Sequence, residues 1–458
     1  MADTGLKAGF ARVDISPKEP MPLFGYGNND KRLHETVLDG ICTTCVAFQD
    51  DVTTVLLFTN DFGQAFEKVM DEAREKITAR TGVPRENIML SSTHTHSGPD
   101  CSCEVIPYTA KYNEYATDGM AEAAEKALQD LAPAVMKGGT VETHGLNFVR
   151  HYTRVSGNIT GDVFGDFLID PETRELVKDR SAYADHTTEA DRLMLLVKFD
   201  RMESEKKSIL LANWRAHASI TGGNYKKECS ADFPHSFRKT VEEVLGCHVA
   251  YFQGASGNIN PRSRIKEEDC TRDYMEFGRE LAAFAIRGER TLKPLRIRPI
   301  RSFSENYTAR VNHSEDAKVP EAKEVQKLWH ELNELRPVQE FGFPRKIWSP
   351  YHADSIVQRS KMGKNIDIEL HGVTIGDFAW TTVPCEQFDV NAKHIRDRLP
   401  FPVTFAMGYT NQDPGYIPSA LAFAYGCYET HNCLFAPGTG EEVAEELIRK
   451  MKALWDED

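Results

Sequence analysis

The sequence predicts an α/β fold built around a mixed β-sheet. Apolar runs of strand length alternate with amphipathic stretches of helical period through most of the 458 residues. The turn signals Asp50-Asp51 and Gly376-Asp377 each separate two apolar runs, so part of the sheet should be antiparallel. No Pro/Ser/Gly-rich linker, repeat or low-complexity tract divides the chain, and we therefore expect one continuous domain over residues 1–458.

Each expected element follows from one of these two periods. The apolar runs predict strands at residues 44–48, 53–59, 88–91, 192–199, 208–214 and 248–253, with a hairpin over 372–382. The amphipathic stretches predict helices at residues 65–81, 111–131, 233–245, 271–286, 321–335, 387–398 and 441–454. The polar stretches 157–186 and 336–366 show neither period, and we interpret them as insertions or lids.

Charge and composition narrow the classes of function. A formal net charge of −14 without a long Lys/Arg cluster argues against nucleic acid or anionic lipid as a partner, so we expect a small-molecule substrate. No apolar stretch has the length of a membrane span and the N-terminus lacks a signal-peptide core, so we expect a cytoplasmic protein. The sequence does not indicate an oligomeric state. The ten cysteines are scattered, as is typical of reduced thiols, and Cys42 and Cys45 lie in one strand-like run where they cannot share a face.

Two histidines follow one of the predicted strands. His94 and His96 stand in Thr-His-Thr-His-Ser-Gly-Pro, directly after the apolar run at 87–90. Because side chains two residues apart leave a strand on the same face, both imidazoles should reach one pocket floor as metal ligands or proton-transfer groups. The same spacing also occurs in histidines that are simply buried or exposed, so the pair alone decides nothing.

Other predicted strands also end in polar or glycine-containing segments. Ligands collect outside strand ends in open α/β sheets, so we expect these ends to converge. His217 follows one strand and Glu386 follows another, and two imidazoles with a carboxylate are the ligand types of a catalytic zinc site. The alternatives remain open at this point: His217 could pack on Trp214, and Glu386 could cap or charge a helix N-terminus.

Several segments carry a family resemblance. They are Asn87-Ile-Met-Leu-Ser-Ser-Thr-His-Thr-His-Ser-Gly-Pro99, Asn213-Trp214 with His217, the glycine loop ending at Pro261, Val383-Pro384-Cys385-Glu386, the segment 416–429, and the opening Ala8-Gly-Phe-Ala-Arg-Val-Asp-Ile-Ser-Pro17 with Gly25-Tyr26-Gly27. In this order they resemble the neutral/alkaline (non-lysosomal) ceramidase family. The resemblance spans essentially the whole chain, and it implies that fold's single catalytic domain with mixed sheets and flanking helices.

The resemblance also implies roles for individual residues. A zinc ion would be bound by His94, His217, Glu386 and Tyr416. Arg150 would lie near the substrate amide, Tyr428 would face the reacting carbonyl, and His96 would be a non-ligand histidine suited to general acid/base work. Asp61 either orients a ligand from behind or is an ordinary loop acid.

The sequence departs from the family in three respects. The family's proposed nucleophilic serine is Asn260 here, and we expect neither the family's C-terminal immunoglobulin-like domain nor an export signal. We therefore expect a zinc-dependent hydrolase that cleaves an amide bond in a small soluble substrate by metal-activated water, rather than ceramide itself. Hydrolysis of an ester, lactone or glycosidic bond is the first alternative, and a non-catalytic protein that binds zinc or a metabolite is the second.

Overall fold

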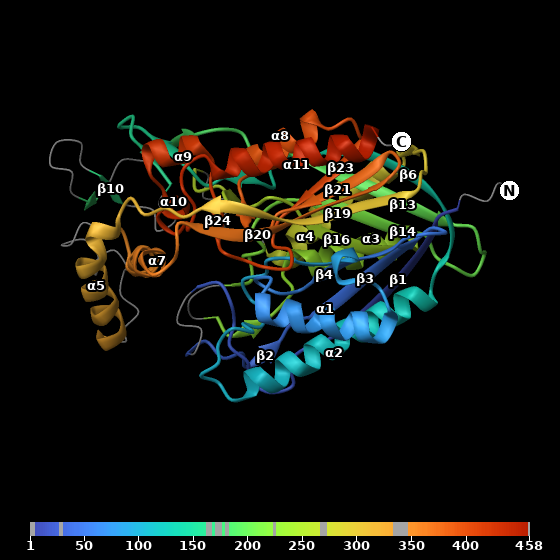
Figure 1. Cartoon of the computed structure of the whole chain (residues 1–458), viewed down its shortest axis with the longest axis horizontal. Helices are drawn as coiled ribbons and strands as arrows, with labels where there is room; N and C mark the ends of the chain where they lie inside the picture. The colour runs from blue at the N-terminus through green and yellow to red at the C-terminus, as the bar shows by residue number, and fades with distance from the viewer. Residues whose placement is uncertain are drawn as a thin grey trace.

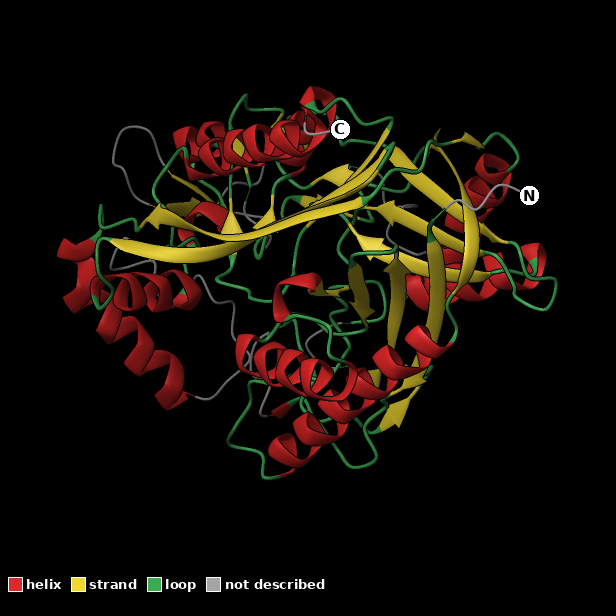
Figure 2. Cartoon of the chain, turned by 45° about the vertical axis from the view of Figure 1, so that its right-hand side comes forward, coloured by secondary structure: helices red, strands yellow, loops and turns green. Residues whose placement is uncertain are grey.

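Two β-sheets lie face to face, with helices on both outer faces. The computed structural model describes residues 5–26, 31–161, 167–169, 176–178, 183–222, 226–265, 273–332 and 347–456. Helices α1 and α2 run along one side of the molecule and α8 and α11 along the opposite side (Figure 1). A second view shows the strands enclosed between these helical layers (Figure 2).

The larger sheet is mixed, as the sequence predicted. Its strands follow the order β16-β14-β13-β6-β1-β3-β4-β5, and β18 pairs with β6. The pairs β4–β5 and β14–β16 are parallel, whereas the remaining neighbours are antiparallel. The strands are β1 (Lys7–Asp14), β3 (Cys42–Gln49), β4 (Thr54–Asn60), β5 (Ile88–Ser92), β6 (Ala132–Glu142), β13 (Leu193–Arg201), β14 (Ile209–Trp214), β16 (His248–Gln253) and β18 (Lys293–Pro294).

The smaller sheet has four strands in the order β19-β20-β21-β23. They are β19 (Ile300–Arg310), β20 (Asn365–Ile375), β21 (Phe378–Thr382) and β23 (Val403–Met407). The predicted hairpin is confirmed, because Ile375 pairs with Phe378 around Gly376-Asp377. Gly376 has a φ of +69°, and a Cβ there would lie 2.2 Å from the Arg296 carbonyl, so this turn requires glycine.

Most of the predicted helices are present. The helices on the larger sheet are α1 (Glu67–Thr81), α2 (Tyr108–Gln129), α3 (Phe233–Leu245) and α4 (Tyr274–Glu289), and those on the smaller sheet are α8 (Asp389–Arg398) and α11 (Thr439–Asp456). The others are α5 (Val319–Leu332), α7 (Pro350–Ser360), α9 (Ala420–Tyr425) and α10 (Tyr428–His431). No helix among the described residues is both long and apolar enough to cross a membrane.

The two stretches predicted as insertions or lids contain regular structure. Helix α7 lies in the second stretch, where the Ser349 hydroxyl accepts a hydrogen bond from the His352 N–H and Pro350 occupies the first turn. The first stretch contains β9 (Ile159–Thr160), β10 (Phe167–Ile169), β11 (Leu176–Lys178) and β12 (Tyr183–His186). Residues 162–166, 170–175, 179–182 and 333–346 of these stretches lie outside the described residues.

Burial on both faces explains the continuous apolar runs of the central strands. In β4, Leu56 and Phe58 pack under α1 and α2, whereas Val55 and Leu57 face the smaller sheet. Successive side chains alternate between the two faces, so consecutive positions in the middle of such a strand are apolar. These strands therefore form a rigid frame whose ends can hold loops in fixed positions.

Short ladders fix those loops. Two of them adjoin the strand ends described below: β7 (Phe148–Val149) pairs with β17 (Ile259–Asn260), and β22 (Glu386–Gln387) pairs with β24 (Tyr416–Ile417). The other short strands are β2 (Thr36–Val37), β8 (Tyr152–Arg154) and β15 (Glu228–Cys229).

A largely buried ion pair joins helix α1 to the smaller sheet. Arg74 of α1 is 1% exposed and forms a two-pronged pair with Glu369 of β20, with Nη1–Oε2 at 2.7 Å and Nη2–Oε1 at 2.9 Å. Burial raises the pKa of Glu369, but hydrogen bonds from His371 and Arg74 outweigh burial and hold that pKa well below its ordinary value. The ionised carboxylate thus stabilises the fold.

We expect Glu369→Gln to lower the free energy of unfolding by about 3 kcal/mol at pH 7, because Arg74 would keep a buried charge without its partner. Since the pKa of Glu369 is lowered by folding, its contribution is present above the unfolded pKa of about 4.3 and is lost as the pH falls below it. Urea denaturation at pH 7 and pH 3 should therefore show a difference between wild type and variant that shrinks in acid. Glu104→Gln, which breaks an exposed pair with Lys68, is the control and should leave the midpoint unchanged.

Candidate active site

The ends of several strands from both sheets meet at one place. Three isolated β-bridges join residues at or just after the ends of these strands. They pair Ser91 with Thr410, Thr95 with Ala218, and Gly254 with Met407. They connect the ends of β5, β14, β16 and β23, so the predicted convergence is confirmed.

His94 and His96 both reach this place, but not by strand alternation. Strand β5 ends at Ser92, and His94 has a φ of 60°, in the left-handed region that residues with a side chain rarely adopt. The turn after β5, and not one face of the strand, therefore brings the two rings together. The expectation that strand alternation would do so was wrong. The two Nε2 atoms lie 3.2 Å apart, and the His94 ring stacks on Tyr409 at 4.3 Å between centroids.

His217 faces the same point. Its ring lies 4.6 Å from that of His94, and its Nδ1 lies 3.1 Å from the Ile259 carbonyl. The Trp214 indole packs instead on Phe233 and Phe277. The alternative in which His217 packs on Trp214 is therefore wrong.

Glu386 completes the group. Helix α8 begins only at Asp389 after its N-cap Phe388, so Glu386 does not cap it. Glu386 lies in β22 opposite Tyr416 of β24, and its Oε2 lies 3.3 Å from His94 Nε2 and 3.5 Å from His217 Nε2.

These atoms fit a metal ion. His94 Nδ1 and His217 Nδ1 each face a backbone carbonyl, of Gly63 at 2.5 Å and of Ile259 at 3.1 Å, so each Nδ1 carries the proton and each Nε2 a lone pair. Burial lowers the pKa of His217 to about 4, which keeps the ring neutral. Glu386 is also buried, and its Oε2 faces both of these Nε2 atoms, at 3.3 Å and 3.5 Å. Three electron-pair donors therefore face one another.

The spacing and hydrogen bonding of these atoms suit a bound cation. Glu386 Oε2 has no hydrogen-bond partner among the described residues, although it is buried. Zinc bonds of about 2.0–2.1 Å to N and O in a tetrahedron place neighbouring ligand atoms about 3.3–3.4 Å apart, close to the separations seen here. His96 belongs to the same group by distance, since the donor atoms of His94, His96 and His217 lie within 4.8 Å of one another. The structure thus adds His96 to the possible ligands.

Arg150, Tyr416 and Tyr428 lie beside the three donors. Arg150 Nη1 is 3.2 Å from His217 Nε2, and Nη2 donates to the Tyr416 hydroxyl at 3.2 Å. The rings of Tyr416 and Tyr428 lie 5.7 Å apart, and each is less than 6 Å from the guanidinium carbon. The structure therefore brings together all the predicted residues named so far in one buried cluster.

Asp61 lies elsewhere. Its carboxylate forms a two-pronged pair with Arg238 at 2.8 and 2.7 Å, and both side chains are buried. The acceptor that orients His94 is the carbonyl of Gly63. Asp61 is thus a buried acid that stabilises the fold through Arg238. The sequence could not predict that the Gly63 carbonyl orients His94, because every residue has a backbone carbonyl.

Asn260 and Ser256 lie in the glycine loop. Asn260 is half-buried in β17 opposite Phe148, one residue after the carbonyl that faces His217. Ser256 is fully buried, and its hydroxyl contacts Gln253 Nε2 at 2.8 Å and the Tyr409 hydroxyl at 2.7 Å.

The glycine loop also positions Glu386. A Cβ on Gly257 would lie 2.4 Å from the Glu386 carbonyl oxygen, and the Gly257 N–H donates to the Gln387 carbonyl at 2.9 Å. The sequence suggested that this loop lets backbone approach a ligand. At Gly257 the close approach is to the backbone of the candidate metal-binding residue itself.

Comparisons with known proteins identify the fold that carries this group of residues. No family model matches the sequence. A neutral ceramidase of Mycobacterium tuberculosis is 25% identical over 171 residues, which are 34% of this chain and 27% of that protein. The crystal structure of the neutral ceramidase from Pseudomonas aeruginosa superposes with a TM-score of 0.71 at 16% identity, covering 100% of this chain and 75% of that one. The fold is neutral ceramidase-like. A ceramidase complexed with C2 gives the same TM-score over 99% of this chain and 76% of that one, so the resemblance seen in the motifs is confirmed.

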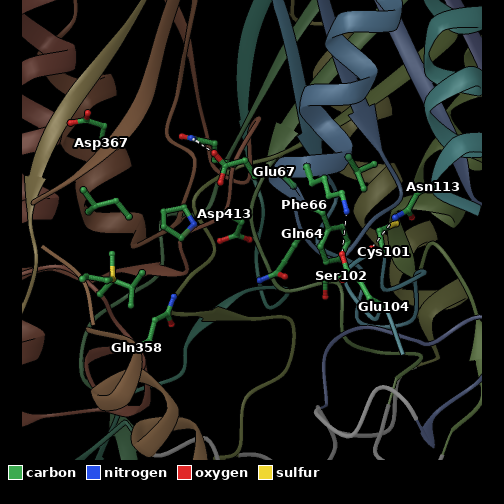
Figure 3. A pocket seen from close by; sticks show the side chains of 18 residues that line it. Gln64, Phe66, Glu67, Cys101, Ser102, Glu104, Asn113, Gln358, Asp367 and Asp413 are labelled. Carbon is green, nitrogen blue, oxygen red and sulfur yellow. Dashed lines mark hydrogen bonds and ion pairs between the residues drawn. The ribbon is translucent and has the colours of Figure 1, made fainter. Parts of the chain in front are cut away.

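A cavity of about 510 Å³ borders the site of this ceramidase-like fold (Figure 3). Gln64, next to the carbonyl that holds His94, and Asp413, whose carboxylate accepts from the Gly415 N–H, both line it. None of the four predicted metal ligands lines it, so it adjoins the site and is not the site. Its other polar lining residues include Glu67, Lys68, Ser102, Glu104, Asn113, Gln358 and Asp367.

We expect Gly257→Ala to weaken zinc binding about 10–100-fold, because the added methyl group would displace the Glu386 backbone. Competition with a chromophoric chelator measures this. Gly363→Ala is the matched control, since a Cβ there would meet nothing within 4 Å. Equal zinc affinity in the two variants would contradict the role given to Gly257.

Proposed function

We propose that this protein is a zinc-dependent hydrolase that cleaves an amide bond in a small polar substrate. The observation that carries the proposal is the convergence of two imidazoles and a carboxylate on one point, with an arginine beside them. The similarity to neutral ceramidases supports the choice of an amide bond.

The chain's own residues supply binding and orientation. His94, His217, Glu386 and Tyr416 would hold the ion, which when bound lowers the pKa of water towards ~7 and polarises a carbonyl. Arg150 and Tyr428 would stabilise the negative charge that develops on the substrate oxygen, a contact whose loss typically costs ~10²–10³ in turnover. His96 would transfer the proton.

The charged lining of the adjoining cavity supports a polar substrate. Glu67, Glu104, Asp367 and Lys68 line it beside apolar side chains, and so does Asp413, where burial raises the pKa of the carboxyl well above its ordinary value. A long acyl chain would gain less here than in a wholly apolar cavity, because the charged groups of the lining would lose contact with water when the chain entered. We therefore propose that ceramide is not the main substrate. Esters, lactones or glycosidic links remain the alternative bonds for the same metal site.

We expect the purified protein to contain about one zinc ion per chain and to hydrolyse short N-acyl amides faster than lactones or detergent-dispersed ceramide. His94→Ala and His217→Ala should abolish both zinc content and turnover, whereas His96→Ala should abolish turnover and keep most of the zinc. Elemental analysis and assays with and without chelator measure these quantities. Stoichiometric zinc in a His94→Ala/His217→Ala double variant would refute the metal site. Loss of zinc in His96→Ala would make His96 a ligand, and zinc binding without turnover of any substrate class would support a binding protein.

The absence of a serine at position 260 leads to a second prediction. An asparagine amide can hold a water molecule or a substrate hydroxyl but cannot form an acyl-enzyme. We expect Asn260→Ala to lower turnover while the zinc content stays unchanged. Mass spectrometry of a rapidly quenched reaction should find no acyl adduct, and Ser256 is already committed to Gln253 and Tyr409. An adduct on any residue would contradict direct attack by water.

A further inference from the structure

We propose that Glu429 is a positioning residue that holds Arg150 against the candidate metal site and neutralises its charge, so that the site can bind a cation. This inference rests on the proposed function. Glu429 is fully buried in the short helix α10.

Both oxygens of the Glu429 carboxylate have partners. Oε1 accepts from Arg150 Nε at 2.5 Å, and Oε2 lies 2.9 Å from His151 Nε2. His151 Nδ1 in turn lies 2.7 Å from the Tyr425 hydroxyl. A neutral His151 satisfies this chain if Tyr425 donates to Nδ1 and Nε2–H donates to Glu429.

The contact at Nε determines where the rest of the guanidinium lies. The group is planar, so when its Nε edge is fixed by Glu429 the two Nη groups are fixed as well. They are the atoms that contact His217 Nε2 and the Tyr416 hydroxyl, at 3.2 Å each. Glu429 thus orients the only part of Arg150 that faces the site.

Charge compensation is the second role of Glu429. A guanidinium this close to a bound divalent cation repels it strongly, because charges in a buried site are poorly screened. Burial raises the pKa of Glu429, but Arg150 and His151 outweigh burial and lower it to about 2, so the carboxylate is ionised at neutral pH. The negative charge therefore offsets that of Arg150.

Glu429 also belongs to a second group of possible ligands. The donor atoms of His151, Cys427 and Glu429 lie within 4.8 Å of one another. However, both carboxylate oxygens and both imidazole nitrogens already have protein partners, and Arg150 supplies a positive charge beside them. This arrangement is balanced without a metal ion, so we assign it to positioning and not to a second metal site.

The test separates charge from geometry. We expect Glu429→Gln to weaken zinc binding about 10–100-fold, the usual effect of losing a group that supports a metal site. Arg150→Met should not weaken it, and the double variant should bind zinc within a few-fold of Arg150→Met, because neither charge is then present. Glu429→Asp keeps the charge but shortens the reach, so zinc affinity should stay near that of wild type while kcat falls and KM stays unchanged.

Glu315→Gln is the matched control. Glu315 accepts from His352 Nε2 and Arg359 Nη2, each at 2.8 Å, which is the same combination of Arg, Glu and His away from the site. This variant should unfold more easily yet bind zinc like wild type. Thermal unfolding of each variant accompanies the zinc titration, which uses the full chain.

Three outcomes would overturn the proposal. They are a Glu429→Gln variant that binds zinc as tightly as wild type, a double variant as weak as Glu429→Gln alone, and a second zinc ion in wild type that is lost in Glu429→Gln. If Glu429→Gln does not fold, an unchanged kcat in Glu429→Asp would overturn it instead. A wild-type protein without zinc would refute the proposed function as well, which distinguishes the two failures.

Discussion

This fold holds two imidazoles and a carboxylate against one another in a buried place. Glu386 Oε2 lies within 3.5 Å of the Nε2 atoms of both His94 and His217, and burying polar groups this close together is costly unless the surrounding fold fixes them. Backbone carbonyls fix both imidazoles from behind, and the short ladder of β22 with β24 fixes the carboxylate. The two packed sheets supply the rigidity on which these contacts depend.

The same constraint explains the second layer of residues around the site. Arg150 brings a positive charge next to a place suited to a cation. The buried side chain of Glu429 pairs with Arg150, and buried His151 lies against the same carboxylate. A similar cluster of Glu315, His352 and Arg359 lies away from the site, and it shows that this chain also uses such triads for structure. Glu429 therefore differs from Glu315 because its arginine lies beside the candidate metal site, and not because its contacts are of another chemical kind.

Much of the frame could be predicted from the sequence, because its strands are buried on both faces and read as unbroken apolar runs. β6 was missed, since Gly138 and Gly139 lower strand propensity; here Leu295 and Val403 occupy the space that a side chain at Gly138 would fill. β19 was missed because much of its surface is exposed and its apolar pattern is weak. Helix α7 was hidden in a polar stretch, although Ser349-Pro350 is a helix start signal.

The site was predictable in part. His94, His217 and Glu386 follow strands and carry the family's motifs, so they could be named. The left-handed conformation of His94 could not be, because it depends on contacts made by the rest of the fold. Glu429 could not be linked to Arg150 either, since 279 positions separate them and no local pattern connects an acid in a short helix with a base in a distant loop.

The contact between Gly257 and the Glu386 backbone has a consequence for how the protein matures. The donors come from positions 94, 217 and 386, and the loop that fixes the last of them comes from the other sheet. Contacts between segments so far apart form late, because closing long loops is entropically unfavourable. A nascent chain that has emerged only as far as the larger sheet holds two imidazoles but no carboxylate. Capture of the proposed metal ion would thus be coupled to the docking of the two halves, and the ion would enter a nearly finished protein rather than nucleate its folding.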